Sequence, residues 1–208
     1  MAACDDMKIE IIGRGGHAAL INKTINPITV ASELIINTKQ KVENTKNSSP
    51  YVLEFGDFRA FGASNVIPEK ALVEGTLRTM DEDFRILACK LLLKKSKEIE
   101  KKYSAKCNFK IIKGYPSLYN NPDLTYKCSS LASDYLGENK IKNLPIRMAS
   151  EDFSFYSQKC SACFFRLGVR NEKKGITHLV HTPKFDIDHH AIEIGVGVMS
   201  YFAINLVR

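Results

Sequence analysis

The feature that most constrains this chain is the alternation of two hydrophobic periods through residues 7–113. Four stretches alternate apolar and polar residues or are rich in strand-forming side chains, and two stretches between them have the helical period. The predicted strands are residues 7–12, 51–61, 71–80 and 107–112. The elements therefore follow one another as strand, helix, strand, strand, helix and strand. This order is that of the split βαβ or ferredoxin-like arrangement, in which two helices cover one face of the sheet.

Both predicted helices have clear start signals. The first should run from about Pro27 to Val42, because Asn26 is a good N-cap and proline fits the first helical position. Asp81 should cap the second helix, which has acidic residues in its first turn. We expect the core-facing residues to be Ile28, Ala31, Leu34 and Ile35 in the first helix, and Phe84, Leu87, Ala88 and Leu91 in the second.

The pattern changes after residue 113. The remaining predicted elements are a helix near 124–136, a short helix after Ser150, a strand around 163–167 and a helix near 189–207. One strand with three helices does not make the sheet, covered on both faces, that an α/β layer architecture requires. We therefore expect residues 114–208 to be an incomplete part of an α/β domain, whose other strands come from elsewhere.

Composition is that of an ordinary soluble globular protein, with 208 residues of which 44% are hydrophobic and 25% charged. No run of about 18 apolar residues and no leader pattern is present, so we expect no membrane association and no secretion. Six scattered cysteines favour a reducing, cytoplasmic location with free thiols. Most of the +7 net charge falls in residues 90–113, where lysines alternate with glutamates, so a solvated helix face is expected and nucleic-acid binding is not.

One motif follows the first predicted strand, and another precedes the third. GRGGHAA (13–19) places His17 directly after three glycines that permit close backbone approach and unusual φ angles. It indicates a functional loop, although a structural Gly-rich strand exit remains an alternative. SNVIPE (64–69) contains Asn65, which is either a turn residue or a ligand contact.

Further candidates lie later in the chain. Arg78, at the end of a predicted strand, can hold a carboxylate bidentately or can be a surface residue. In MASEDFSFY (148–156), Glu151 and Asp152 follow Ser150, a possible N-cap, and the helix dipole alone would favour both carboxylates. Residues 178–190 concentrate four histidines, but proline in this stretch argues against a helix presenting several of them to one metal ion.

Taken together and in this order, the motifs resemble one family, the binuclear metallohydrolases of the aminoacylase and carboxypeptidase type. This family includes hippurate hydrolases, N-acyl amino acid amidohydrolases and auxin-conjugate hydrolases. The matching segments are GRGGHAA, NPI, SNVIPE, EGTLRT, GYP, SEDFSFY, FFRLGVRNEKKG and HTPKFDID. The resemblance implies a ferredoxin-like lid and dimerisation domain in residues 1–113, and the C-terminal part of an α/β catalytic domain in residues 114–208.

The resemblance also implies roles for individual residues. His181 is similar to the metal ligand that the C-terminal part supplies, and His17 to the lid histidine that stabilises the tetrahedral intermediate, often across a dimer. Asn65 and Arg78 correspond to lid residues that contact the substrate, with its carboxylate as the expected target. Glu151 is expected near the site as a further substrate-binding residue.

The family's remaining ligands and general base lie in motifs that these 208 residues do not contain: His-x-Cys-Gly-His-Asp, a Glu-Glu pair and a histidine before proline. The resemblance implies two divalent ions, zinc or manganese, in the complete enzyme. Because one ligand does not hold a catalytic ion, we expect this chain alone to bind no metal stably and to be inactive. MAACDD resembles internal family sequence, so Met1 is expected to be an internal methionine, with the missing half removed, lost or carried by a separate chain.

Two hypotheses about function follow. The first is a metal-dependent amidohydrolase, or part of one, that acts on an N-acyl amino acid or peptide-like substrate and forms a homodimer through the lid. The second is a non-catalytic dimerisation or ligand-binding module, because fold alone does not imply activity. The exact substrate stays open, since relatives often have Met-Pro-His after GGHAA where this chain has Leu20, Ile21 and Asn22.

Overall fold

The computed structural model describes residues 1–206, which divide into two compact units. Met1–Leu118 and Ile146–Gln158 form the first unit. Tyr119–Pro145 and the residues from Lys159 onward form the second. The chain therefore returns once to the first unit, through a short segment that lies far along the sequence from the rest of it.

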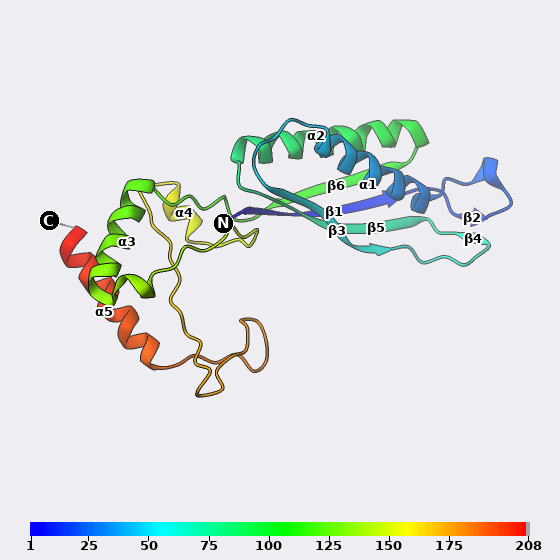
Figure 1. The fold of residues 1–208 in the computed structure, drawn as a ribbon. Coiled ribbons are helices and arrows are strands. Elements are labelled where there is room, and N and C mark those ends of the chain that lie inside the picture. Colours follow the sequence, from blue (N-terminus) through cyan, green and yellow to red (C-terminus); the bar gives the residue numbers. More distant parts are fainter. Residues whose placement is uncertain (207–208) are drawn as a thin grey trace. The chain divides into compact units, whose positions relative to one another are not determined.

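The first unit is built on a four-stranded antiparallel sheet in the spatial order β3-β5-β1-β6. Its strands are β1 (Ala3–Ile12), β3 (Tyr51–Arg59), β5 (Lys70–Thr79) and β6 (Lys106–Lys113). Two helices, α1 (Pro27–Glu43) and α2 (Glu82–Tyr103), lie side by side on one face of this sheet (Figure 1). The main elements follow one another in the order expected from the sequence, with a small two-stranded ribbon in addition.

Local capping explains where both helices begin. The side chain of Asn26 accepts a hydrogen bond from the Ile28 amide (2.9 Å), and Pro27 occupies the first turn of α1. Asp81 caps α2 in the same way, since its carboxylate accepts from the Phe84 amide at 3.0 Å. Both predicted N-caps are therefore confirmed, and each satisfies an amide that the helix itself leaves unpaired.

The helix faces are rotated slightly from the prediction. Ile28 and Leu87, expected in the core, are 38% and 41% exposed. In their place the core receives Val30 from α1 and Leu92 from α2.

Side chains on the two faces of the sheet differ in polarity. On β1, Met7, Ile9 and Ile11 are buried under the helices, whereas the alternate residues Lys8 and Glu10 are on the opposite face. That face carries ion pairs of opposite charge between neighbouring strands. It is a solvated surface, as antiparallel sheets with helices on one side commonly have.

The second unit is mainly helical. Its long helices are α3 (Pro122–Leu136) and α5 (His190–Leu206). They pack against each other through a small core of Cys128, Ala132, Val198 and Phe202. The short helix α4 (Ser154–Ser157) belongs to the first unit.

Two predictions for the later part of the chain are wrong. Residues 163–167 are not assigned to a strand, because no neighbouring strand within residues 1–206 pairs with them. The short helix begins at Ser154, with Phe153 at the N-cap, and Ser150 does not cap it. Backbone carbonyls of Glu151 and Asp152 accept its first amides instead. The predicted end of the last helix, Val207, lies outside the described residues.

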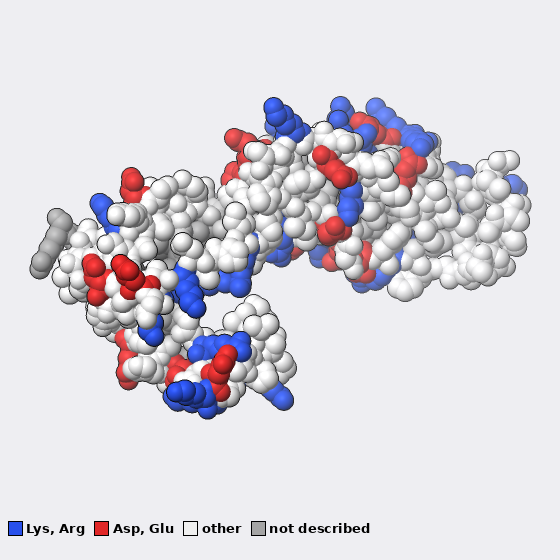
Figure 2. All heavy atoms as spheres, viewed as in Figure 1, with Lys and Arg blue, Asp and Glu red and all other residues white. Residues whose placement is uncertain are grey.

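The lysine-rich stretch forms the exposed side of α2, where lysines pair with nearby acids. Lys95 contacts Glu98 at 2.6 Å, and Lys97 contacts Glu100 at 2.8 Å. Figure 2 shows basic and acidic side chains interspersed over the viewed face of the molecule. Within residues 1–206 no helix has the length and apolar character needed to cross a membrane.

Candidate functional site

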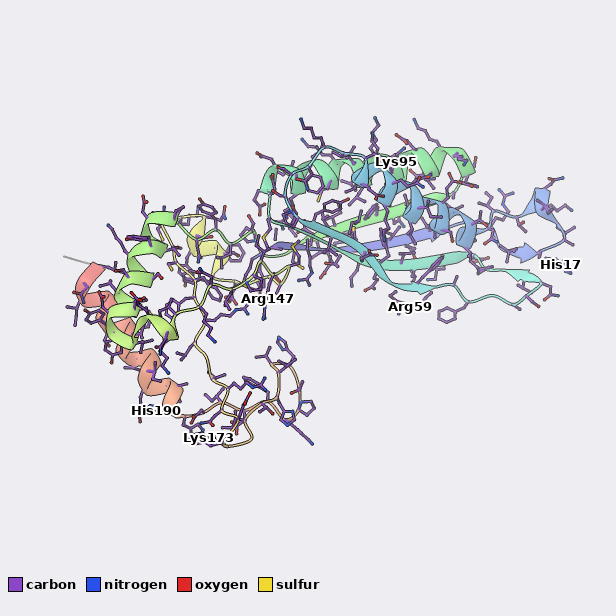
Figure 3. All side chains as sticks on the ribbon, in the orientation of Figure 1. His17, Arg59, Lys95, Arg147, Lys173 and His190 are labelled. Carbon is purple, nitrogen blue, oxygen red and sulfur yellow. The ribbon has the colours of Figure 1, made fainter. Side chains whose placement is uncertain are left out.

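A short ribbon brings two of the candidate residues together. Strands β2 (Gly16–His17) and β4 (Val66–Ile67) pair antiparallel, with His17 opposite Val66. The Ala18 amide donates to the Asn65 carbonyl at 2.9 Å. His17 and Asn65 are both exposed, so the two paired segments present an imidazole and a carboxamide to solvent. Figure 3 shows His17 on this ribbon, beyond the end of the four-stranded sheet.

Glycine explains why the sequence can form this ribbon. A Cβ atom on Gly13 would lie 2.1 Å from the Ile25 carbonyl oxygen, so only glycine allows the two backbones to approach. Gly16 has a φ of 151°, a backbone conformation that residues with a side chain rarely adopt. On the other strand, Asn65 lies in a tight turn that is closed by the Val66 amide donating to the Ala63 carbonyl (3.0 Å).

The His17 ring has a defined tautomer in its neutral form. Its Nδ1 accepts a hydrogen bond from the Ala19 amide at 3.1 Å. A neutral imidazole that accepts at Nδ1 carries its proton on Nε2. Since His17 is exposed, its Nε2–H is presented to solvent as a hydrogen-bond donor.

Arg78 lies near the opposite end of the sheet from the ribbon. It is on β5, opposite Cys4 of β1, whereas the other end of β5 leads into the ribbon strand β4. Its Nη1 donates to the Met148 carbonyl at 3.0 Å, and the side chain is half-buried. One of its five N–H donors is thus used to hold the returning segment 146–158.

Glu151 belongs to the same returning segment. The Ala149 carbonyl accepts from the Ala2 amide at 2.9 Å, so this segment is fastened to the start of β1 as well as to Arg78. Glu151 is half-buried and its carbonyl accepts from Ser154 at 3.2 Å. Arg78 and Glu151 therefore share one end of the first unit, and His17 and Asn65 share the other.

His181 lies in the second unit, in an exposed turn. Its φ of 65° is in the left-handed region, which is uncommon for a residue other than glycine. The surrounding stretch 178–190 is mostly irregular and exposed. Uncommon backbone conformations are enriched at functional sites, so this observation agrees with a special position for His181 without defining its role.

Two other polar residues of that stretch have structural partners. Asp188 accepts from Lys174 (2.7 Å) and from Asn171 (2.5 Å), and these contacts, Lys174 first, lower its pKa to about 2. His190 contacts Glu193 at 3.0 Å on the first turn of α5. Asp188 is thus an anchor for the turn at 171–176, and its carboxylate oxygens are already in use.

A binuclear metal centre needs several ligand side chains close together. Within residues 1–206 no three side chains among histidine, cysteine, aspartate and glutamate are grouped so that they could hold a metal ion. About three protein ligands per ion are usual in catalytic sites. The residues present here therefore do not fit a metal centre by themselves.

Sequence reasoning missed one polar cluster. Asp5 is fully buried and forms an ion pair with Arg85, which also contacts Glu82. The sequence feature that could have revealed this cluster is Asp5 itself, an acidic residue at an inward-facing position of the first strand. The predicted strand began only at Met7 and therefore excluded Asp5.

Comparisons with known proteins extend over almost the whole chain. The sequence profile described as "Peptidase family M20/M25/M40" matches residues 9–205. Thermostable carboxypeptidase 2 of Saccharolobus solfataricus is 30% identical over 99% of this chain and 52% of its own length. N-acetyl-L-cysteine deacetylase of Bacillus subtilis is 32% identical over 92% of this chain and 45% of its own. The chain thus spans about half the length of these curated relatives.

Solved structures resemble the fold. A structure from methicillin resistant Staphylococcus aureus has a TM-score of 0.86 with 22% identity, over all of this chain and 53% of that one. The YXEP protein of Bacillus subtilis, described as a dinuclear metal binding peptidase from the M20 family, has a TM-score of 0.74 with 24% identity. It matches 99% of this chain and 50% of its own. The mixed α/β fold is therefore that of M20 peptidase structures.

Proposed function

Because this chain belongs to peptidase family M20/M25/M40, we propose that it is part of a metal-dependent amidohydrolase that cleaves an N-acyl amino acid or a related peptide-like substrate. Residues 1–113 are proposed as its ferredoxin-like lid and dimerisation domain, and residues 114–208 as the C-terminal part of its catalytic domain. The antiparallel sheet with two helices on one face supports the lid assignment. The relatives named deacetylase and carboxypeptidase support the reaction class.

The observation that carries the proposal is the presentation of His17. Its Nδ1 is occupied by the Ala19 amide, so the neutral ring offers Nε2–H as a donor. A donor of this kind can stabilise the oxyanion that forms when water adds to an amide carbonyl. We assign that role to His17. We propose that Asn65, whose carbonyl is bonded to the same ribbon, contacts the substrate.

Arg78 and Glu151 are proposed as further substrate contacts, with Arg78 binding the substrate carboxylate. Asn65 lies beyond one end of β5 and Arg78 near the other, and Lys70 to Arg78 alone spans about 26 Å at about 3.3 Å per residue. No small substrate bridges that distance within one chain. A site that uses both ends of the sheet therefore needs two copies of the chain, which supports a homodimer.

His181 is proposed as the one metal ligand that this chain contributes, at a zinc or manganese centre. Since no three such ligand side chains are grouped within residues 1–206, we propose that the chain alone is inactive and holds no metal in stoichiometric amount. A purified sample with about one tightly bound metal ion per chain and turnover of an N-acyl amino acid would overturn that part of the proposal.

A chimera tests the reaction. The half of the Bacillus subtilis deacetylase that this chain does not match would be joined to this chain, and hydrolysis of N-acetyl amino acids measured with added Zn²⁺ or Mn²⁺. His17→Ala should lower kcat by about 100-fold or more with little change in KM, as loss of an oxyanion donor does. Lys23→Ala, in the same exposed loop, is the matched control and should not change kcat. A folded chimera without turnover would contradict the proposal.

Mixing two inactive chimeras tests the dimer. If His17 serves the site of the partner that holds Arg78, His17→Ala and Arg78→Ala chains should regain about a quarter of full activity after subunit exchange. Half of randomly formed dimers are mixed, and each mixed dimer carries one intact site. No gain on mixing would show that both residues act within one chain.

A non-catalytic dimerisation or ligand-binding module is the second candidate. It is favoured by one observation, namely that no metal-ligand group of three is present within residues 1–206. Sedimentation of a stable dimer without metal, together with an inactive but folded chimera, would select this candidate over the hydrolase.

A further inference from the structure

Two cysteines of the second unit are neighbours in space although they lie far apart in the sequence. Cys128 is on α3 and is buried in the small core between α3 and α5. Cys163 lies on the irregular segment that follows α4, is half-buried, and packs against the same core. Three residues before it, Cys160 is exposed. The roles proposed above for catalysis and substrate binding involve none of these thiols.

The environment of Cys128 identifies Cys163 as its neighbour. Burial and, after it, the adjacent Cys163 side chain raise the pKa of Cys128 to about 11. A thiol with such a pKa stays protonated near neutral pH, and both residues are present as thiols in this structure. The pair is therefore a dithiol, with one sulfur shielded in the core and the other at its border.

Hydrogen bonds on both sides of Cys163 fix its position. The Asn121 amide donates to the Ala162 carbonyl at 2.9 Å. The Asn120 carboxamide accepts from the Phe164 amide and donates to the Phe164 carbonyl, each at 2.9 Å. These bonds tie both sequence neighbours of Cys163 to the residues immediately before α3. The segment and the helix are thus held together without a link between the sulfurs, so that a disulfide needs little backbone movement.

From this arrangement we propose that Cys128 and Cys163 form a redox-sensitive site, which a low-molecular-weight disulfide such as oxidised glutathione converts into an intramolecular disulfide. Since no three ligand side chains in the described part of the chain are grouped to hold a metal ion, oxidation is the chemistry that this pair supports. Protein disulfides in reducing compartments are usually transient and redox-sensing, so the bond is expected to be reversible.

The reaction consists of two thiol–disulfide exchanges. Cys163, the more exposed of the two, loses its proton, and its thiolate attacks one sulfur of oxidised glutathione, whose S–S bond breaks to release one glutathione thiolate. Cys128 then loses its proton and attacks the Cys163 sulfur, which releases the second glutathione thiolate. Two protein thiols are oxidised, one small disulfide is reduced to two thiols, and the two protons pass through solvent to the departing thiolates. Excess reduced glutathione reverses the reaction.

The bond closes a loop of about 35 residues, from Cys128 to Cys163. This loop contains Ile146–Gln158, the segment that belongs to the first unit. The chain leaves the second unit and returns to it within the loop, so the disulfide links the exit to the return. Because a closed loop restricts the unfolded chain, the bond should raise the unfolding temperature by about 10 °C.

Oxidation followed by peptide mapping tests the site. The folded chain is incubated with oxidised glutathione, digested with trypsin without reduction, and analysed by mass spectrometry. Cleavage after lysine and arginine yields peptide 128–140, which contains Cys128, and peptide 160–166, which contains Cys160 and Cys163. The two peptides should be joined, and reduced glutathione should separate them. Peptides that stay separate, or that carry only glutathione, would overturn the proposal.

Three variants assign the sulfur atoms. Cys160→Ser is the matched control, and its two peptides should still be joined. Cys163→Ser should abolish the link. Cys128→Ala combined with Cys160→Ser should stop at a mixed disulfide of Cys163 with one glutathione, because no second thiol is present to resolve it. A link that Cys160→Ser abolishes, or that Cys163→Ser retains, would assign the bond to Cys160 and contradict the proposal.

Thermal unfolding tests the consequence of the bond. Oxidised glutathione should raise the unfolding temperature of the parent chain and of Cys160→Ser by about 10 °C, and should leave that of Cys163→Ser unchanged. A chain with joined peptides but an unchanged unfolding temperature would exclude the stabilising role. None of these measurements depends on hydrolysis, so the redox site and the proposed function fail separately.

Discussion

Asp5 on β1 and Arg85 on α2 form a buried ion pair in which the guanidinium donates to both carboxylate oxygens. The Gly114 amide also donates to Asp5 (3.1 Å), and Glu82 accepts from the Ser117 amide at 2.6 Å. This cluster fastens the residues that follow β6 to the first strand and to the start of α2. It fixes the place where the chain leaves the sheet.

Removing one partner of this pair should be strongly destabilising. Asp5→Ala leaves Arg85 buried without its main acceptor, and we expect the free energy of unfolding to fall by about 3–5 kcal/mol. Urea denaturation measures this change. Lys39→Ala is the control, because its contact with Glu54 is exposed and should be worth about 0.2–1 kcal/mol. Equal losses in both variants would contradict the assigned role of Asp5.

Replacing Gly13 tests the close approach at the base of the ribbon. Gly13→Ala puts a Cβ atom onto the Ile25 carbonyl, and we expect a loss of about 1–3 kcal/mol in unfolding free energy. Gly168→Ala is the matched control, since no atom lies within 4 Å of the added Cβ. Thermal unfolding of both variants checks the difference, and a neutral Gly13→Ala would refute the close contact.

The cysteines should differ in reactivity with pH. Burial raises the pKa of Cys107 to about 11, and burial together with nearby Asp5 does the same for Cys89. Because the thiolate is the reactive form, both should resist iodoacetamide at pH 8.5 and react only as the pH approaches 11 or the protein unfolds. Cys160 is exposed and should be alkylated first. Peptide mass mapping over time gives the order, and early labelling of Cys89 would contradict it.

The anchor at Asp188 should be visible in an acid titration. Its pKa is lowered from 3.8 to about 2 by Lys174 and Asn171, so its contribution to stability is complete above pH 3.8 and is lost as the pH falls through about 2. Lys174→Met should move the carboxyl titration, followed by NMR, back toward 3.8. Lys173→Met, at the next position, should leave it unchanged, and a shift of equal size there would exclude a specific pair.

The features that could be predicted from the sequence are those that depend on neighbouring residues. The order of the main elements and both N-caps were correct, because Asn26 and Asp81 act on amides only two or three residues away. The faces of the helices were less predictable. Ile28 and Leu87 lie at the border of the apolar stripe, and the rotation of each helix on the sheet decides which neighbour is buried.

Local sequence signals do not predict contacts between residues that are far apart in the sequence. The proximity of His17 and Asn65 depends on pairing between segments about fifty residues apart, which neither motif encodes by itself. The failed strand at 163–167 has a similar cause, because a strand is defined by its neighbour as well as by its own side chains. The roles assigned to His17, Asn65, Arg78, Glu151 and His181 stay predictions until the chimera is measured.

The central position of β1 also affects how the chain can fold as it is synthesised. It is made before both of its neighbours, because β5 and β6 begin only at Lys70 and Lys106. At about 5–20 residues per second, the ribosome needs about 5–20 s to add the hundred residues that complete its pairing. Until β5 has been made, the apolar side chains of β1 have no neighbouring strand of this sheet to pair with. These side chains are therefore exposed to aggregation and to chaperones for longer than if β1 paired with the strand that follows it in the sequence.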